Sequence, residues 1–204
     1  MKIIGITGPT GAGKTTALNA LADLGGAVID CDAVYHELLQ TNHAMLDELR
    51  ARYGEGVFGA DGRLDRKALG SIVFHDPQAL SDLNAITHRY VDHAVDERLA
   101  KAREEGRPAA AVDAIALLES GLKDKCHALL AVTAPDEVRV ERIMAREGIS
   151  RDYAQSRINA QKPNSYFEEH CTYVFRNDCP DAQTARERAR ELFHTILKEE
   201  NSHD

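Results

Sequence analysis

The fold of this chain is decided near its N-terminus, by the stretch Gly8-Pro9-Thr10-Gly11-Ala12-Gly13-Lys14-Thr15. The stretch matches the pattern G-x-x-x-x-G-K-[ST] of a phosphate-binding loop, or P-loop. It also stands in the setting that such a loop needs, because a short β-type run, 2–7, precedes it and helix-forming residues, 15–24, follow it. Glycines let successive backbone N–H groups turn toward phosphate oxygens without a Cβ clash, and the helix adds its positive N-terminal end. The stretch therefore predicts a nucleoside triphosphate site.

The side chains that close this loop have expected roles of their own. Lys14 can reach the β- and γ-phosphates, and the Thr15 hydroxyl can ligate Mg²⁺, so ATP and Mg²⁺ are the expected cofactors. A GTPase would carry the base-reading pattern N-K-x-D, which this sequence lacks. A motor or helicase ATPase would usually be longer. A short chain with a long insertion after the second strand favours a small-molecule kinase.

Strand-like and helical runs alternate along the chain, which predicts an α/β fold with a parallel sheet. The fold expected is a P-loop kinase fold, with a five-stranded parallel sheet flanked by helices, a helical insertion and a helical lid. We expect a single domain, 1–204, with a nucleotide-binding core at 1–32 and 108–204, an acceptor-binding insertion at 33–107, and a lid at about 136–165. The predicted strands are Lys2–Thr7, Ala27–Asp30, Ala109–Val112, Ala128–Thr133 and Tyr173–Phe175, and the last helix runs from about Asp181 to Lys198.

Acidic residues follow two of these strands. Asp30 and Asp32 end the second strand, which we expect to lie next to the P-loop strand, and ligand sites in such sheets lie at the carboxyl ends of strands. A carboxylate there can orient an attacking hydroxyl and take its proton late in phosphoryl transfer. The alternative is that these aspartates cap the next helix. Asp113 ends the third strand and is a candidate for holding Mg²⁺, with a structural cap or an acceptor contact as alternatives.

Three arginines lie three and four residues apart after the fourth strand: Arg139, Arg142 and Arg146. At that spacing they share one face of a helix. Such a face can close over ATP and neutralise charge that gathers on the transferred phosphoryl group, with Arg142 as a catalytic residue and Arg146 as a nucleotide-binding one. The alternative is a solvated basic face paired with neighbouring glutamates.

Composition limits the possible partners. The formal net charge is −8, which argues against nucleic acid as the main partner, because the phosphate backbone favours a basic surface. Four cysteines show no zinc-like spacing and are expected to be reduced thiols. We find no signal peptide and no apolar run of the length that a membrane helix needs. The expectation is a cytoplasmic protein with no membrane partner, a monomer or a weak homo-oligomer.

Several motifs, in order along the chain, resemble the dephospho-CoA kinase family. They are Val28-Ile29-Asp30-Cys31-Asp32, Gly62 to Leu69 with Ile72-Val73-Phe74, Ile86-Thr87-His88, Asp113 to Leu122, and Arg157-Ile158-Asn159-Ala160-Gln161. The resemblance implies that ATP phosphorylates the ribose 3′-hydroxyl of dephospho-CoA and that Asp32 is the proton acceptor. It also implies that the ATP phosphates are held by Gly11, Ala12, Gly13, Lys14, Thr15 and Thr16, and we expect Gly8 to belong to the same nucleotide site. The chain departs from the family pattern at Arg89 and at Ile115-Ala116, on the presumed acceptor side.

Two other functions fit the P-loop alone. One is a nucleoside or nucleotide kinase with the same core. The other is a nucleotide-dependent regulatory module that hydrolyses ATP slowly and changes shape for a partner. The acids after the second strand argue against such a module, because a switch has no need of a base beside the γ-phosphate.

Overall fold

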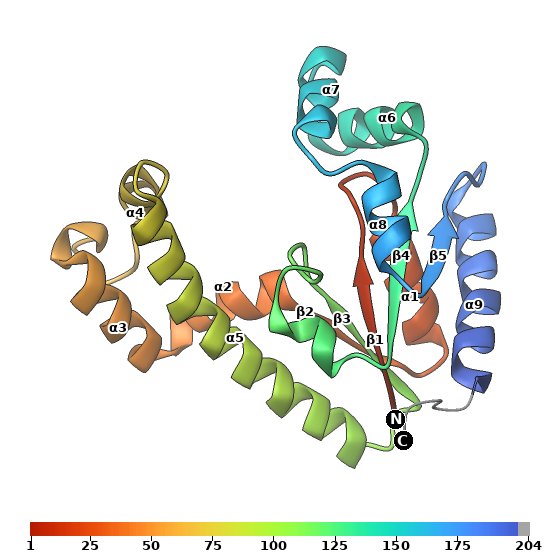
Figure 1. Ribbon diagram of the computed structural model, residues 1–204, viewed down its shortest axis with the longest axis horizontal. Coiled ribbons are helices and arrows are strands. Elements are labelled where there is room, and N and C mark those ends of the chain that lie inside the picture. Colours follow the sequence, from red (N-terminus) through yellow and green to blue (C-terminus); the bar gives the residue numbers. More distant parts are fainter. Residues whose placement is uncertain (200–204) are drawn as a thin grey trace. The chain divides into compact units, whose positions relative to one another are not determined.

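All five predicted strands form, and they lie side by side in one parallel sheet (Figure 1). A computed structural model describes residues 1–199. The third and fifth strands each extend one residue beyond the prediction, to Asp113 and Arg176. The strands are β1 Lys2–Thr7, β2 Ala27–Asp30, β3 Ala109–Asp113, β4 Ala128–Thr133 and β5 Tyr173–Arg176.

The order of the strands in the sheet is β2-β3-β1-β4-β5. The expectation that β2 neighbours the P-loop strand is therefore wrong, because β3 lies between β2 and β1. Burial explains this order: Ala109–Val112 is fully buried, which suits an interior strand, whereas β2 has two exposed residues, which suits an edge. A consequence for the site is that Asp113 pairs with Ile6, one residue before β1 ends.

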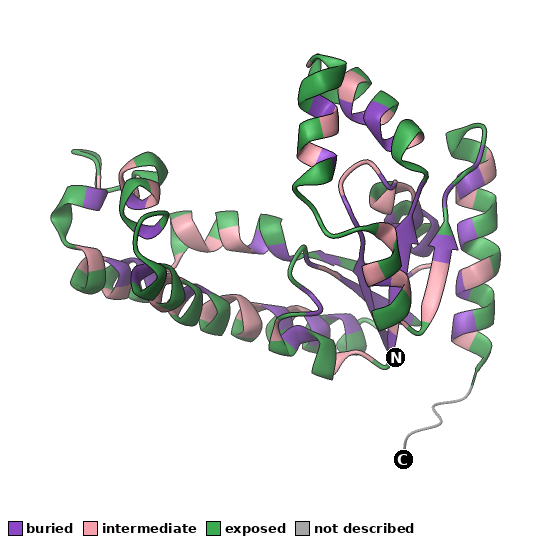
Figure 2. Ribbon diagram, turned by 45° about the horizontal axis from the view of Figure 1, so that its top comes forward, coloured by how far each residue is buried: buried purple, intermediate pink, exposed green. Residues whose placement is uncertain are grey.

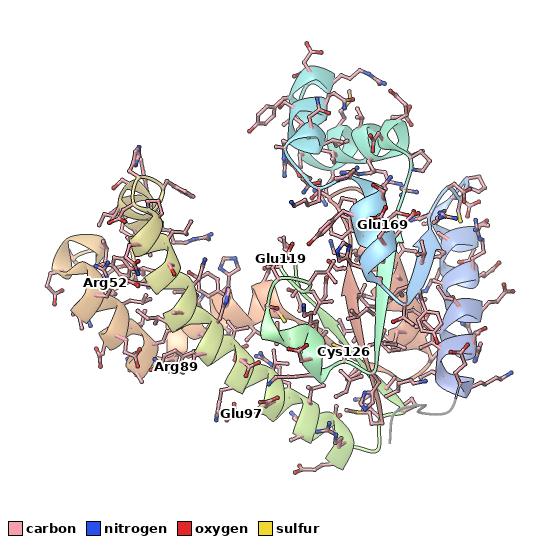
Figure 3. All side chains as sticks on the ribbon, in the orientation of Figure 1. Arg52, Arg89, Glu97, Glu119, Cys126 and Glu169 are labelled. Atoms are coloured by element: carbon pink, nitrogen blue, oxygen red, sulfur yellow. The ribbon has the colours of Figure 1, made fainter. Side chains whose placement is uncertain are left out.

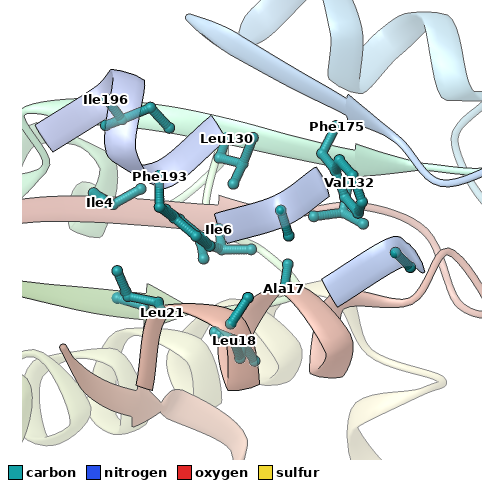
Figure 4. Close-up of a cluster of buried hydrophobic side chains, with 14 of the residues drawn as sticks. Ile4, Ile6, Ala17, Leu18, Leu21, Leu130, Val132, Phe175, Phe193 and Ile196 are labelled. Atoms are coloured by element: carbon teal, nitrogen blue, oxygen red, sulfur yellow. The ribbon is translucent and has the colours of Figure 1, made fainter. Parts of the chain in front are cut away.

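The main hydrophobic core lies on one face of the sheet, where two helices cover it (Figures 2 and 4). These helices are α1 Lys14–Asp23, which follows the P-loop, and α9 Ala182–Lys198. The Lys2 ammonium ties the first strand to the end of α9, because it donates hydrogen bonds to the carbonyl oxygens of Ile196 and Glu199, both at 2.6 Å. Among the buried side chains of this core are Ile4, Ile6, Leu18, Leu21, Leu130, Val132, Phe175, Phe193 and Ile196.

The opposite face of the sheet carries a smaller cluster, in which Leu118, Ala131 and Phe167 pack together. Phe167 comes from the short helix α8, Asn164–His170. Two further helices, α6 Asp136–Glu147 and α7 Arg151–Asn159, form an arm that has its own core. That core consists of Val140, Ile143, Ala154 and Ile158. A short 3₁₀ helix, η2 Gly121–Lys125, precedes β4.

The segment Asp30–Arg98 forms a second compact unit, and the rest of the chain forms the first. Ion pairs join two of its helices: Arg52 binds Asp82 at 2.7 Å, and Arg89 binds Glu48. Both arginines are labelled in Figure 3. The unit contains α2 Cys31–Thr41, α3 His43–Tyr53, η1 Glu55–Val57, α4 Arg66–Val73 and most of α5 Pro77–Glu104. Its small core comprises Val57, Leu69, Val73 and Ala79.

Two further expectations can be compared with the structure. Among the helices built from residues 1–199, none has an apolar stretch that could cross a bilayer. The four cysteines, Cys31, Cys126, Cys171 and Cys179, are all free thiols, as expected.

Candidate functional site

The P-loop takes a backbone shape that only glycine accepts at Gly8, Gly11 and Gly13, and the approach of neighbouring atoms is closest at the first and last of these. Gly8 has φ 145°, and a Cβ atom there would lie 2.0 Å from the carbonyl oxygen of Val132 on β4. Gly13 has φ 97°, and its Cβ atom would lie 2.1 Å from Nδ2 of Asn177. Real atoms cannot approach so closely, and positive φ is unfavourable for other residues. The two glycines therefore let β4 and the segment after β5 pack directly on the loop.

Three polar side chains hold the carbonyl groups of the loop, and we call them the outer donors: Arg139, Arg142 and Asn177. Arg139 Nε donates to the Thr10 oxygen at 2.9 Å. Arg142 donates to the oxygens of Gly11 and Ala12 at 3.3 and 3.2 Å, and Asn177 Nδ2 donates to the Ala12 oxygen at 2.9 Å. In a planar trans peptide the C=O and the next N–H point in opposite directions. The outer donors therefore direct the N–H groups of Gly11 and Gly13 away from themselves.

The backbone N–H groups at the other side of the loop are free to bind an anion. Within residues 1–199, the amides of Gly11, Gly13, Lys14 and Thr15 have no hydrogen-bond partner. The hydroxyl of Thr7, buried at the end of β1, also lacks one in that range. Lys14 Nζ donates to the Gly8 oxygen at 3.0 Å, which leaves two ammonium protons for another acceptor. This donor set fits the phosphates of a nucleoside triphosphate.

Oxygen groups suited to a magnesium ion lie at the same edge of the sheet. Thr15 is exposed in the first turn of α1, and Asp113 ends β3 opposite Ile6. No group of three or more potential ligand side chains occurs in the part of the chain that the structure describes. Mg²⁺ typically binds one or two protein oxygens and takes its other ligands from phosphate and water. The two residues therefore fit Mg²⁺ bound together with a triphosphate.

Arg139 differs from the other two arginines because its side chain is only 1% exposed. Besides Thr10, its guanidinium donates to Asp136 Oδ1 at 2.8 Å and to Gln161 Oε1 at 3.0 Å. The same Gln161 oxygen accepts the Thr10 N–H at 3.1 Å, so both backbone polar groups of Thr10 are held. Burial lowers the pKa of Arg139, and the charge is retained because these acceptors surround it. Arg139 thus supports the loop from outside.

Arg142 and Arg146 are placed differently again. Arg142 reaches the loop and also donates to the backbone oxygen and Oδ1 of Asn177, at 3.4 and 3.3 Å. Burial lowers its pKa. Arg146, one turn further along α6, pairs with Glu147 at 2.7 Å on the surface, and Arg157 binds the same glutamate. The structure therefore brings Arg142 to the loop, whereas Arg146 makes the kind of glutamate pair that the alternative interpretation expects.

The side chains of Asp30 and Asp32, at the end of β2 and just after it, have different surroundings. Asp30 is the N-cap of α2, and its carboxylate accepts the Ala33 N–H at 3.0 Å, which confirms the capping interpretation for this residue. Asp32 lies in the first turn of α2 and is exposed. Its side chain has no hydrogen bond or ion pair within residues 1–199. The carboxylate of Asp32 is therefore not committed to a cap, and its catalytic role remains a prediction.

Sequence reasoning did not identify Asn177 as part of the site, although a signal was present. Asn177 directly follows β5, and its N–H donates to the Thr133 oxygen at the end of β4 at 2.7 Å. Polar residues just after parallel strands gather at one edge of the sheet. That rule selected Asp32 and Asp113, and applied to the last strand it would have selected Asn177 too. Gln161 was noted only as part of a motif.

Comparison with known proteins gives one consistent result. The family model described as dephospho-CoA kinase matches residues 2–183. A dephospho-CoA kinase of Geobacter sulfurreducens is 40% identical over 163 residues, covering 80% of this chain and 83% of that protein. One of Dehalococcoides mccartyi is 36% identical over 179 residues, covering 88% and 90%.

Solved structures agree with these sequence matches. A Thermus thermophilus crystal structure has a TM-score of 0.80 and 35% identity, and covers 97% of this chain and 98% of that one. Dephospho-CoA kinase from Campylobacter jejuni has a TM-score of 0.70 at 22% identity, with the same coverage. Shikimate kinase from Bacteroides thetaiotaomicron reaches 0.52 at 17%, covering 95% and 98%, a likeness of fold alone. The P-loop kinase fold predicted from the sequence is therefore confirmed.

Proposed function

The chain belongs to the dephospho-CoA kinase family, and we propose that it transfers the γ-phosphoryl group of ATP to the ribose 3′-hydroxyl of dephospho-CoA, giving coenzyme A. The observation that carries the proposal is the extent of the family match, residues 2–183. The match includes the P-loop, the helical unit after β2 and the α6–α7 arm together. A likeness confined to the P-loop would support only nucleotide binding.

The loop and its outer donors form the donor side of the proposed reaction. The free amides of Gly11 and Gly13 to Thr15, with the Lys14 ammonium, bind the β- and γ-phosphates of ATP. Thr16 and Arg146 complete the nucleotide contacts. Thr15 and Asp113 would hold Mg²⁺, which would neutralise charge on the triphosphate. Arg142 is assigned to stabilising the charge on the phosphoryl group in transfer; in the structure its guanidinium binds the carbonyl side of the loop.

Asp32 acts on the acceptor side of the proposed reaction. The ribose O3′ attacks the γ-phosphorus, the bond to the β–γ bridging oxygen breaks, and ADP leaves with that electron pair. The 3′-hydroxyl proton passes to the Asp32 carboxylate and then to water. An exposed carboxylate is a weak base, but in a loose transition state it need only orient the hydroxyl and accept the proton late.

The acceptor is tested by ADP release from the purified protein with ATP and Mg²⁺. Dephospho-CoA is compared with AMP, CMP and uridine at equal concentration, and mass spectrometry identifies the phosphorylated product. We expect turnover with dephospho-CoA, a product with the mass of coenzyme A, and loss of turnover when EDTA removes Mg²⁺. Turnover with a nucleoside or nucleotide but none with dephospho-CoA would refute the acceptor. ADP release without stimulation by any acceptor would refute kinase activity.

The role of Asp32 is tested by substitution of the two neighbouring aspartates. Asp32→Asn keeps the shape and removes the proton acceptor, so kcat should fall by about 10²–10⁴-fold while ADP still binds. Asp30→Ser is the matched control, because serine keeps the helix cap. It should retain nearly normal kcat. Similar kcat values for the two variants would refute the role of Asp32.

A further inference from the structure

We propose that Asn177 is a positioning residue of the donor site, one that sets the direction of the Gly13 N–H and holds the Arg142 guanidinium at the same time. The proposal rests on the nucleotide-binding role of the loop and is independent of the acceptor. It concerns a residue outside the glycine loop and outside the arginine series of α6.

The contacts of Asn177 join three segments that are distant in sequence. Its Nδ2 donates to the Ala12 oxygen of the loop at 2.9 Å, and its Oδ1 accepts from Arg142 on α6 at 3.3 Å. Its own N–H donates to the Thr133 oxygen at the end of β4 at 2.7 Å, and its carbonyl oxygen accepts a second bond from Arg142 at 3.4 Å. The residue is only 2% exposed. Every one of its polar groups is therefore used in the interior.

The amide group of Asn177 is suited to this place because it donates on one side and accepts on the other. The donating side faces a carbonyl oxygen, and the accepting side faces a guanidinium. Because the Ala12–Gly13 peptide is planar and trans, a donor on the Ala12 oxygen points the Gly13 N–H to the opposite side. The missing Cβ atom of Gly13 is what allows the amide to come so close. Aspartate has the same shape as asparagine but cannot donate to Ala12.

A buried asparagine could also serve folding alone, so the test must separate the two roles. The probe is ADP with Mg²⁺, and its dissociation constant is measured by calorimetric titration without any acceptor. Asn177→Asp places an oxygen against the Ala12 oxygen, and Asn177→Ala leaves that oxygen with the Arg142 bond alone. Without the Asn177 bond the Gly13 N–H is no longer held toward the phosphates, and the loss of about one hydrogen bond to ADP should raise the dissociation constant roughly tenfold. Melting curves set a titration temperature at which all variants are folded.

A control and a double substitution complete the experiment. Asn164→Ala removes a similar amide bond, 2.8 Å to the Ala134 oxygen, that does not touch the loop. It should leave the dissociation constant within about twofold of the wild type. If Asn177 acts through Arg142, the combined variant Asn177→Ala with Arg142→Met should bind ADP better than the product of the single effects predicts.

Three results would overturn the proposal. The first is an ADP dissociation constant within twofold of the wild type for both Asn177 variants. The second is a loss of ADP affinity in Asn164→Ala as large as in the Asn177 variants. The third is a double variant whose rise in dissociation constant equals the product of the rises in the two single variants. Failure of the wild type to phosphorylate dephospho-CoA would refute the proposed function and leave these binding measurements valid. Should one Asn177 variant not fold, the other decides the outcome by the same criteria.

Discussion

Replacement of Arg139 by methionine tests whether the buried arginine of α6 stabilises the protein. Methionine keeps much of the apolar stem but removes the bonds to Thr10, Asp136 and Gln161, at 2.8–3.0 Å. Two effects compete. Removal of a desolvated charge is favourable, and burial indeed lowers the pKa of this guanidinium. Removal of one partner only, however, leaves the Thr10 oxygen without its donor and the Gln161 oxygen with the Thr10 N–H alone, which is unfavourable.

The second effect should be the larger one. Asp136 is 62% exposed and regains water, so its bond contributes little to the loss. The bond to Thr10 is part-buried and involves a charged donor, and such bonds contribute about 1.5–3 kcal/mol. With the bond to Gln161 added, we expect the free energy of unfolding to fall by about 2–3 kcal/mol. For a chain of this length that corresponds to a fall in Tm of roughly 4–12 °C.

Thermal unfolding followed by circular dichroism, with urea titration alongside it, measures the change. Arg146→Met is the matched control, because Arg146 is on the same helix but its side chain is 59% exposed and pairs with Glu147 at the surface. We expect its Tm to stay within about 2 °C of the wild type. If Arg139→Met melts no lower than Arg146→Met, the reasoning is refuted, and the buried guanidinium contributes no net stability.

Three further outcomes follow from the structure. Gly13→Ala should weaken ADP binding at least about tenfold, because its new Cβ atom would clash with the Asn177 side chain. Gly148→Ala is the control: Gly148 has φ 67°, and its new Cβ atom would have no other atom within 4 Å, so this variant should lower only the Tm. Equal ADP affinities in these two variants would contradict the clash. Lys2→Met should lower the Tm by roughly 2–6 °C, since it removes a cation from the C-terminal end of α9, and an unchanged Tm would count against that contact. Burial raises the pKa of Cys126 to about 12, so its thiol stays protonated at pH 8 in the folded protein. In urea the pKa returns to about 8.5. The Cys126 thiol should therefore react with iodoacetamide far more slowly in the folded protein than in urea. Mass spectrometry of the labelled peptides measures both rates, and equal rates would show that the thiol is accessible and ionised.

The elements of this fold could be read from the sequence because each strand is a short apolar run bounded by glycine or polar residues. The order of the strands could not, since it depends on which runs pack against helices on both faces. One clue was present and not used: Ala109–Val112 contains no polar residue, whereas β2 is bounded by glycine and aspartate and has only three apolar residues. Small, wholly apolar strands suit the interior of a sheet, and β3 lies there.

The candidate site was predictable where a motif specifies backbone geometry, and less so where side chains act over long sequence distances. The spacing of Arg139, Arg142 and Arg146 placed them on one helix, but three residues of equal chemistry have three different surroundings. Their surroundings differ because each arginine lies at a different distance from the loop backbone. Helical spacing alone does not predict that distance. Asn177 is 165 residues from the carbonyl that it holds, so no local pattern could reveal the contact.

The outer donors also have a thermodynamic consequence for ligand binding. A glycine-rich loop is ordinarily flexible, and a ligand that orders it loses part of its affinity to conformational entropy. Here the carbonyl groups of Thr10, Gly11 and Ala12 have partners within the protein itself, so the loop is ordered before a phosphate arrives. Nucleotide association should then be limited by diffusion and desolvation rather than by a change in loop shape. Release of ADP should likewise leave the loop ready for the next ATP.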